Sequence, residues 1–575
     1  MPSSLKSDIV VGIDFGTTQG RKKIRLITDW PNPEACNANS DKVPSVIAYQ
    51  DGLVSGWGYE VSTKAEAFRW IKLLLEPEYK HANVTQQVLQ SNKLLKKLNK
   101  RPEDVVSDYL RQIWEYTKED IRKHVGDNSW ESTLKVHIVL TVPAMWSHAA
   151  KDKTLEAARR ASLPDGIRLV TEPEAAALAT LHDKAQDHAL TKGDAFVVCD
   201  AGGGTVDLIS YKTLGLDPLR IEECAVGEGG LCGSVFLDLA FERYIKMIVG
   251  QEQYGTVSEL NKKRMLKDFE FGVKRCFTVE SKKDYSVDLR GVKDDFMAGI
   301  IDETINLKQS MLRTVFDQVC EQIVRLVQNQ MTEIRSNDLA PKAILLVGGF
   351  GSSKYLHHRL ESSYTGQDIV VLQIEGAWSA VCRGACIWGL EQVDRPKFSS
   401  KGSSSTVTVR ISRYNYGVLQ CTPFDPDNHL AEDRFFHEAR NTYYADNQME
   451  WLLRRGDKIT DGRTLTRQLC RSVHGICKTS KDTQTFSDTL YSCQDPEPPT
   501  RLDATAKELC SIRYTIQEST IFKEKPYTSP AKPGEFRDLS FDFDIILGAT
   551  TLDFQVRYHN KTLATVQTEY ADAGN

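Results

Sequence analysis

The 575-residue chain lacks the glycine-rich phosphate motifs that are easiest to recognise in a sequence. It has no Gly-x-x-x-x-Gly-Lys-Ser/Thr segment, which excludes a P-loop, and no Gly-x-Gly-x-x-Gly turn after its first apolar strand, which argues against a dinucleotide fold. No apolar run reaches the ~18 residues of a membrane helix. The formal net charge of -5 gives no sign of a nucleic-acid surface. We therefore expect neither a membrane nor a nucleic acid among its partners.

Cysteine usage and length narrow the class of protein further. The 13 cysteines include no Cys-x-x-Cys pair, and the chain is too long for one ordinary core. The odd number of cysteines and the lack of a recognisable signal peptide predict reduced thiols and a cytoplasmic location. Cys382 and Cys386 lie one helical turn apart, and we interpret them as packing residues of a helix rather than as metal ligands.

Residues 1–392 alternate apolar strands with helical segments, which is typical of an α/β domain. The pattern predicts strands at 135–142, 167–171 and 343–347, and helices at 147–161, 174–181 and 312–327.

The composition changes after residue 392. Residues 393–405 are rich in serine and predict a flexible linker. In residues 406–575 apolar side chains recur at every second position, which predicts a β-rich domain with a hairpin tip at 559–561. The polar stretch 460–535 contains several prolines, and we expect it to include a long loop.

Two glycine–threonine turns, each entered from a buried strand through an aspartate, carry the clearest chemical signal. The first follows Asp14 in the segment Ile9–Thr18, and the second follows Asp200 in the segment Phe196–Asp207. Glycine lets the backbone approach a ligand closely, and successive free N–H groups form a concave site for an anion. The two turns predict two halves of one fold that enclose a polyphosphate and its metal ion.

A third turn, in Leu345–Ser353, and the connecting segment Val170–Ala179 complete a recognisable set. In this order the segments resemble those of the heat-shock protein 70 family, within the actin-like ATPase superfamily, and the layout resembles divergent cytosolic members of the kind common in fungi. The resemblance implies a two-lobed α/β ATPase domain with ribonuclease-H-like halves over residues 1–392. A linker over 393–405 and a β-rich domain over 406–575, similar to a reduced substrate-binding domain, would follow.

The resemblance also implies roles for individual residues toward ATP or ADP and Mg²⁺. Asp14 and Asp200 would hold magnesium, largely through its waters, as suits a cation that dehydrates reluctantly. Glycine and threonine residues of the first two turns would hold the phosphates: Gly16, Thr17, Thr18, Gly202, Gly203, Gly204 and Thr205. Four side chains would serve catalysis: Lys72, Glu172, Asp200 and Asp207. Six residues would contact adenosine: Glu270, Lys274, Arg275, Gly348, Gly349 and Ser352.

Several of these residues also have structural interpretations. Lys72 could be a solvated helix lysine, and Glu172 could cap the helix that follows it. Glu270, Lys274 and Arg275 could form an exposed charged face, where an i,i+4 pair contributes little. We interpret Trp378 as a packing residue rather than as a ligand contact.

The chain departs from the family pattern at three places. Only five residues separate Thr18 from Ile24, so we expect one strand of the usual meander to be missing and ATP hydrolysis to be slow or absent. The serine-rich linker differs from the family's apolar and acidic one. The last residues, 570–575, lack the family's acidic co-chaperone tail, and no long helical lid precedes them.

Three functions follow from these observations. The leading one is an ATP-binding chaperone of the heat-shock protein 70 type whose β-rich domain binds client polypeptide, with co-chaperones that the sequence does not identify. The second is a scaffold that binds nucleotide without hydrolysing it and recruits a protein partner. The third is a small-molecule kinase of the same superfamily, against which the connector at Glu172 and the β-rich domain both argue.

Overall fold

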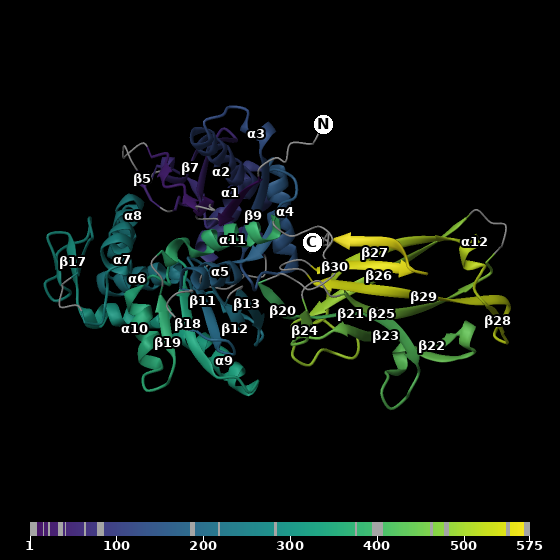
Figure 1. Ribbon diagram of the computed structural model, residues 1–575. Helices are drawn as coiled ribbons and strands as arrows, with labels where there is room; N and C mark the ends of the chain where they lie inside the picture. The colour runs from purple at the N-terminus through teal and green to yellow at the C-terminus, as the bar shows by residue number, and fades with distance from the viewer. Residues whose placement is uncertain are drawn as a thin grey trace. The chain divides into compact units, whose positions relative to one another are not determined.

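Most of the chain is described by a computed structural model (Figure 1). The described residues are 8–14, 17–20, 24–32, 38–40, 42–62, 65–76, 85–184, 190–216, 219–280, 285–373, 376–393, 406–460, 464–476, 482–547 and 552–567. The backbone contacts divide the chain into two compact units, Met1–Thr406 and Val407–Asn575. The first unit alternates helices and strands and the second is built mainly of strands, so the predicted fold class is confirmed.

The first sheet of the first unit is built around β1 in the strand order β10-β9-β1-β2-β3. Its strands are β1 (Asp8–Asp14), β2 (Thr17–Gly20), β3 (Arg25–Leu26), β9 (Lys135–Val142) and β10 (Arg168–Thr171). β9 and β10 run parallel to β1, whereas β2 and β3 continue from it as an antiparallel meander.

The second sheet repeats this plan around β11, in the order β19-β18-β11-β12-β13, with β14 paired to β12. Its strands are β11 (Ala195–Ala201), β12 (Val206–Leu216), β13 (Leu219–Glu223), β14 (Glu228–Gly230), β18 (Pro341–Val347) and β19 (Val370–Gln373). β18 and β19 are parallel to β11, and β12 and β13 form its antiparallel meander. Two halves with the same strand order and directions are the repeated ribonuclease-H-like units expected from the sequence.

The expectation that one meander strand is missing is wrong. β2 pairs with β1, with Asp14 opposite Thr17, and β3 pairs with β2 through Gln19 and Leu26. The meander is short rather than incomplete, because β2 has four residues and β3 has two. A strand of two residues has no alternation of its own from which it could be recognised.

Two helices, α5 (Glu172–Lys184) and α11 (Ala380–Val393), pack against each other between the two halves. At Gly384 the approach is so close that an added Cβ would lie 1.6 Å from the carbonyl oxygen of Ala175. Helix α11 also lies against β1, where a Cβ on Gly12 would lie 2.9 Å from the sulfur of Cys386. Cys386 is therefore a packing residue, as its spacing from Cys382 indicated.

The remaining helices and small sheets surround these two halves. The helices are α1 (Thr85–Leu98), α2 (Pro102–Val125), α3 (Trp130–Thr133), α4 (His148–Arg160), α6 (Ser234–Val249), α7 (Gln251–Thr256), α8 (Glu259–Asp268), α9 (Gln309–Ser336) and α10 (Lys354–Ser363). The small sheets contain β4 (Asp29–Trp30), β5 (Ala38–Asn39), β6 (Val46–Gln50), β7 (Leu53–Trp57), β8 (Ala67–Arg69), β15 (Tyr285–Asp288), β16 (Ile300–Ile301) and β17 (Thr304–Leu307).

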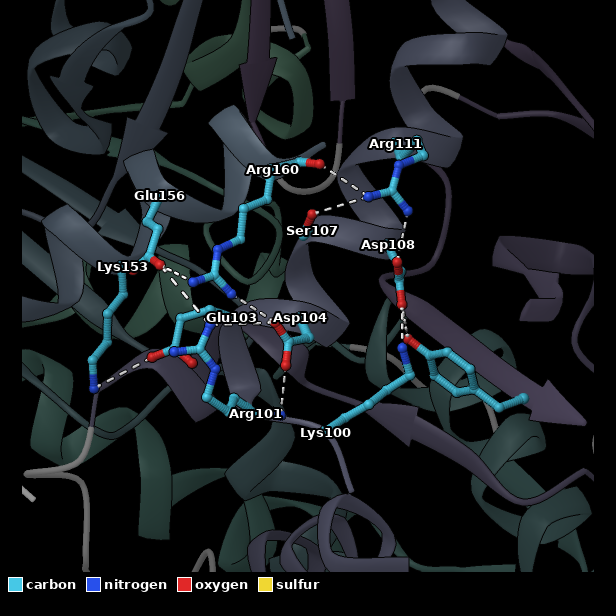
Figure 2. Close-up of polar contacts among 11 residues, drawn as sticks. Lys100, Arg101, Glu103, Asp104, Ser107, Asp108, Arg111, Lys153, Glu156 and Arg160 are labelled. Carbon is cyan, nitrogen blue, oxygen red and sulfur yellow. Dashed lines mark hydrogen bonds and ion pairs between the residues drawn. The ribbon is translucent and has the colours of Figure 1, made fainter. Parts of the chain in front are cut away.

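Charged side chains join α2 to α4 on the surface of the first half (Figure 2). Arg160 of α4 lies 2.8 Å from Asp104 of α2, and Lys153 lies 3.6 Å from Glu103. The pair of Arg160 and Asp104 is partly exposed, and an ion pair of this kind contributes at most about 1 kcal/mol. We therefore attribute the position of α4 mainly to its buried apolar side, which includes Ala157.

The second unit contains two antiparallel sheets that share one core of buried apolar side chains. One sheet has the order β22-β23-β21-β26-β27, and the other contains β25, β28, β29, β30 and β31. The first sheet is formed by β21 (Asn415–Pro423), β22 (Arg434–His437), β23 (Thr442–Leu453), β26 (Thr483–Cys493) and β27 (Lys507–Gln517). The second is formed by β25 (Thr464–His474), β28 (Pro526–Ser529), β29 (Lys532–Leu547), β30 (Leu552–Tyr558) and β31 (Lys561–Gln567). In addition, β20 (Val407–Ile411) pairs with β24 (Lys458–Thr460).

The alternating residues of β29 point into this core as predicted, since Phe541 and Phe543 are almost completely buried. The predicted hairpin tip is also confirmed, because His559 and Asn560 both have positive φ between β30 and β31. The long loop predicted within 460–535 is wrong, because β25 to β28 occupy much of that stretch. β25 is a strand of largely exposed side chains, so its sequence carries little apolar alternation. The predicted linker at 393–405 lies almost wholly outside the described residues.

Within the described part of the chain, no helix combines the length and apolar character needed to span a membrane.

The close approach of α5 and α11 leads to a stability prediction. We expect Gly384→Ala to lower the free energy of unfolding by about 2 kcal/mol or more, because overpacking a tight contact commonly costs 1–3 kcal/mol. Gly255→Ala in α7 is the matched control, since no atom lies within 4 Å of its added Cβ. The midpoints of urea unfolding measure this difference. Equal midpoints for the two variants would contradict the close contact between α5 and α11.

Candidate functional site

Acidic side chains from both halves meet near the ends of their central strands. Asp14 ends β1, and Asp200 lies next to the end of β11. Asp207, on β12, stands directly opposite Asp200 in the antiparallel pair. The three carboxylate residues are buried, with at most 8% of their surface exposed. Each half therefore contributes a carboxylate from the end of its central strand, β1 or β11.

Lys72 and Glu172 form a buried ion pair beside these aspartates. Lys72 belongs to a short 3-10 helix, η2 (Ile71–Leu75), and Glu172 is the first residue of α5. Burial lowers the pKa of Lys72, but Glu172, Asp14 and Asp200 outweigh it, so the pKa is raised and the ammonium stays charged. Lys72 is thus not the solvated lysine of the alternative interpretation.

This environment raises the pKa values of two of the acidic side chains. Burial raises the pKa of Glu172 to about 7, although Lys72 acts in the opposite direction. Burial and the neighbouring carboxylates also raise the pKa of Asp200 well above its usual range. Such shifts mark places where charge is concentrated for chemistry or for ligand binding.

Two neighbouring groups hold the carboxylates in place. The hydroxyl of Thr141 on β9 donates a hydrogen bond of 3.0 Å to Asp14. The backbone N–H of Met145 donates to Asp207 over 3.1 Å. The next residue, Trp146, is completely buried, and its ring lies 5.7 Å from the ammonium of Lys72. The segment after β9 therefore orients residues from both halves.

The second glycine turn, Gly202–Thr205, lies against the first turn of α6. The N–H of Val235 donates to the carbonyl of Gly203 over 2.9 Å, and the N–H of Ser234 donates to that of Gly202 over 3.1 Å. A Cβ added to Gly203 would have no atom within 4 Å. The first N–H groups of α6 thus bond to carbonyl groups of the turn, and the space next to the Cα atom of Gly203 is not filled by other protein atoms.

The third turn, Gly348–Ser352, packs on the end of β11. The N–H groups of Phe350 and Gly351 both donate to the carbonyl of Ala201, over 2.8 and 3.0 Å. Gly348 has a φ of +85°, and an added Cβ would lie 2.3 Å from a carboxylate oxygen of Asp200. Only glycine fits there, so the turn approaches the acidic cluster closely.

The segment with Glu270, Lys274 and Arg275 forms a π-helix, Phe269–Lys274, after α8. Lys274 is 6% exposed and contacts both Glu270 and Asp238 of α6, so it does not belong to a solvated charged face, whereas Arg275 is exposed. Arg275 lies over the ring of Trp378 at 5.2 Å from its centre. A π-turn accommodates one extra residue in a helix, which shifts the register that spacing alone suggests.

Trp378 joins the third turn to this segment. A Cβ added to Gly349 would lie 2.9 Å from its ring, and the ammonium of Lys42 lies 5.0 Å from the ring centre. The indole is only partly buried and receives two cations, so it is more than the packing residue expected from the sequence.

The structure brings most of the predicted residues into one region. Asp14 interacts electrostatically with Lys72, Glu172 and Asp200. The second turn connects β11 to β12, and the third turn packs on the end of β11. Gly16 lies outside the described residues, and for Thr17 and Thr18 only the backbone, in β2, is described.

Sequence reasoning missed three residues of this region: Lys42, Thr141 and Asp238. Thr141 could have been recognised from the sequence, because it is a polar residue within an apolar strand. Lys42 and Asp238 have no comparable local signal, because each reaches its partner from a distant segment.

The buried carboxylates of this region do not by themselves form a complete direct coordination shell for a Mg²⁺ ion. Among the described residues, no group of three or more histidine, cysteine or acidic side chains is arranged to hold a metal ion by itself. Carboxylates that face one space can still bind magnesium through its retained waters, since Mg²⁺ dehydrates reluctantly.

The buried pair of Lys72 and Glu172 leads to a prediction about pH. Lys72→Met removes the cation that lowers the pKa of Glu172, so that pKa should rise above 7. A carboxyl group with a raised folded pKa stabilises at low pH and loses this contribution as the pH rises through that pKa. We expect the variant to lose about 1 kcal/mol more stability than the native protein between pH 7 and pH 8.

Urea unfolding without nucleotide at pH 6, 7 and 8 measures this difference. Adding Glu172→Gln to Lys72→Met should remove the extra pH dependence. An equal loss of stability at pH 6 and pH 8 in the single variant would show that the two side chains do not interact in this way.

Comparison with known proteins identifies relatives of both units. Residues 10–371 match the family model "Hsp70 protein", and residues 410–572 match a model described as a domain of unknown function, DUF8568. Human heat shock 70 kDa protein 12B is 22% identical, with 82% of this chain and 80% of the relative covered. Mouse heat shock 70 kDa protein 12A is 22% identical, with coverage of 71% and 72%.

The chaperone protein DnaK of Mycoplasmopsis synoviae (strain 53) is 25% identical over 60% of this chain, which spans about half of that relative, 52%. The Hsp70 model covers more than half of the 575 residues and includes the strand ends and most of the turns that form the site. The chain therefore belongs to the Hsp70 family and has that family's actin-like, ATP-binding fold.

Proposed function

We propose that the first unit binds Mg-ATP between its two halves and hydrolyses it to ADP and phosphate, and that the nucleotide controls polypeptide binding by the second unit, as in a chaperone. One observation carries the proposal: buried carboxylates from both halves meet a largely buried lysine beside two glycine turns. Phosphoryl transfer depends on this combination, because it needs positioning and charge neutralisation more than covalent chemistry.

The glycine turns support the phosphate-binding part of the proposal. The backbone at Gly203 borders open space, whereas Gly348 allows the adenosine turn to reach the carboxylate of Asp200. A bound magnesium ion would neutralise the charge of the phosphates. Asp14 and Asp200 would hold its water shell, and Lys72 would bind a terminal phosphate oxygen.

Glu172 and Asp207 would orient the attacking water. Glu172 has a pKa of about 7 and therefore accepts or releases a proton near neutral pH. Asp207 is held by the N–H of Met145, so its second carboxylate oxygen keeps a defined direction.

The pairing of β2 with β1 removes the reason for expecting lost hydrolysis. Thr17 stands opposite Asp14 in that pair, so the backbone of the first phosphate turn is anchored at its start. We therefore favour hydrolysis over the purely nucleotide-bound scaffold for the first unit.

A scaffold function still has one observation in its favour. The Hsp70 model ends at residue 371, and the β-rich unit matches a different model over 410–572. The second unit would then recruit a folded protein partner rather than an unfolded client. We place either activity in the cytoplasm, in keeping with the cysteine usage.

Calorimetry and a turnover assay on the full-length protein test the proposal. We expect Mg-ATP and Mg-ADP to bind, ATP to be hydrolysed without an added sugar or polyol, and Asp200→Ala to reduce turnover by about a hundredfold or more, because it removes a charged group at the reacting phosphates. Asp194→Ala is the control, since Asp194 precedes β11 and its carboxylate bonds to Thr191.

A labelled unfolded peptide separates the two roles of the second unit. Release of the peptide that depends on ATP would support the chaperone, and hydrolysis without peptide binding would support the scaffold. Absence of any heat with Mg-ATP or Mg-ADP from the folded protein would contradict the whole proposal.

A further inference from the structure

The side chain of Lys42 reaches the acidic cluster from the loop after β5. Its ammonium nitrogen lies 3.6 Å from a carboxylate oxygen of Asp14 and 5.0 Å from the centre of the Trp378 ring. Its charge also acts on Asp200 of the other half. The region thus contains a second ammonium besides that of Lys72.

The backbone of Lys42 is held firmly, which directs the side chain toward Asp14. Its carbonyl accepts hydrogen bonds from the hydroxyl of Tyr59, at 2.8 Å, and from that of Ser40, at 3.0 Å. The next residue, Val43, is buried against Gly58, where an added Cβ would lie 2.3 Å from the valine. Hydrogen bonds and packing therefore fix the backbone from which the side chain extends.

The ammonium of Lys42 is only loosely bound in this state. Its separation of 3.6 Å from Oδ2 of Asp14 exceeds a normal hydrogen bond, whereas the other oxygen, Oδ1, accepts a hydrogen bond from Thr141. On another side the ammonium faces the ring of Trp378, whose centre is 5.0 Å away and which offers no hydrogen-bond acceptor of ordinary strength. A lysine ammonium has three donors, so it retains capacity for an anion.

We propose that Lys42 is a second phosphate-binding residue of the nucleotide site, which rests between Asp14 and Trp378 until a nucleoside polyphosphate binds. This inference rests on the proposed binding of ATP in the first unit. A polyphosphate that enters among several carboxylates needs cations on its path, and Lys42 supplies one beside Asp14. The phosphate takes up the free donors of the ammonium, and the contact with Trp378 is released.

Calorimetric titration of the full-length protein with ATP, ADP and adenosine, with Mg²⁺ in excess, tests the inference. We expect Lys42→Met to weaken ATP and ADP about tenfold or more, because hydrogen bonds to charged groups are the strong ones. Adenosine has no phosphate and should bind as it does to the native protein. Lys42→Arg keeps the charge and should recover most of the lost affinity.

Lys246→Met is the matched control. Lys246 also combines an ion pair, with Glu242 at 2.9 Å, and a contact with an aromatic ring, that of Tyr254 at 5.1 Å, but it lies on α6 among surface residues. It should leave all three affinities unchanged.

Two results would overturn the inference while the proposed function stands. In the first, Lys42→Met binds ATP and ADP within twofold of the native protein. In the second, adenosine weakens as much as ATP, which would indicate a general distortion of the site. If the native protein bound neither ATP nor ADP, the proposed function itself would be wrong, and the role of Lys42 with it.

Discussion

The burial of several like charges in one place is the constraint on which this protein depends. Asp14, Glu172, Asp200 and Asp207 are all nearly excluded from solvent. Burying a carboxylate without a partner is expensive, and partners are supplied by Lys72, by a threonine hydroxyl and by a backbone N–H. The raised pKa values of Glu172 and Asp200 show that the cost is not fully offset. The cluster of buried carboxylates therefore lowers the stability of the fold and forms a site that favours cations.

The repeated fold explains how such a cluster is assembled from distant parts of the chain. Each half directs its central strand, β1 or β11, toward the same region and turns back as an antiparallel hairpin. Close backbone contacts then hold the halves together, at Gly384 between α5 and α11 and at Gly348 against Asp200. These contacts leave no space for a side chain, so the position of the carboxylates follows from backbone geometry rather than from flexible side chains.

The sequence predicted the parts of this arrangement that depend on local pattern. Buried strands that end in Asp14 and Asp200, and the alternation that buries Phe541, were evident because apolar periodicity and glycine turns are local properties. The short strand β3 was missed, and β25 was mistaken for a loop, because one is too short and the other too exposed to show a period. The π-helix at Phe269–Lys274 was missed because one inserted residue leaves no trace in composition. The role of Lys42 needed three-dimensional information, since its partner is far away in the sequence.

The charge balance of the cluster links nucleotide binding to protons. Two lysine ammonium groups, those of Lys72 and Lys42, face four buried carboxyl groups, and burial raises the pKa of Glu172 and of Asp200. The carboxyl groups of this region therefore take up protons more readily than exposed carboxylates do. A magnesium ion and a polyphosphate would replace this balance with another, because a bound cation favours the ionised form of nearby carboxylates. Protons and cations then compete for the same buried oxygens, so binding of a cation should release protons from the cluster.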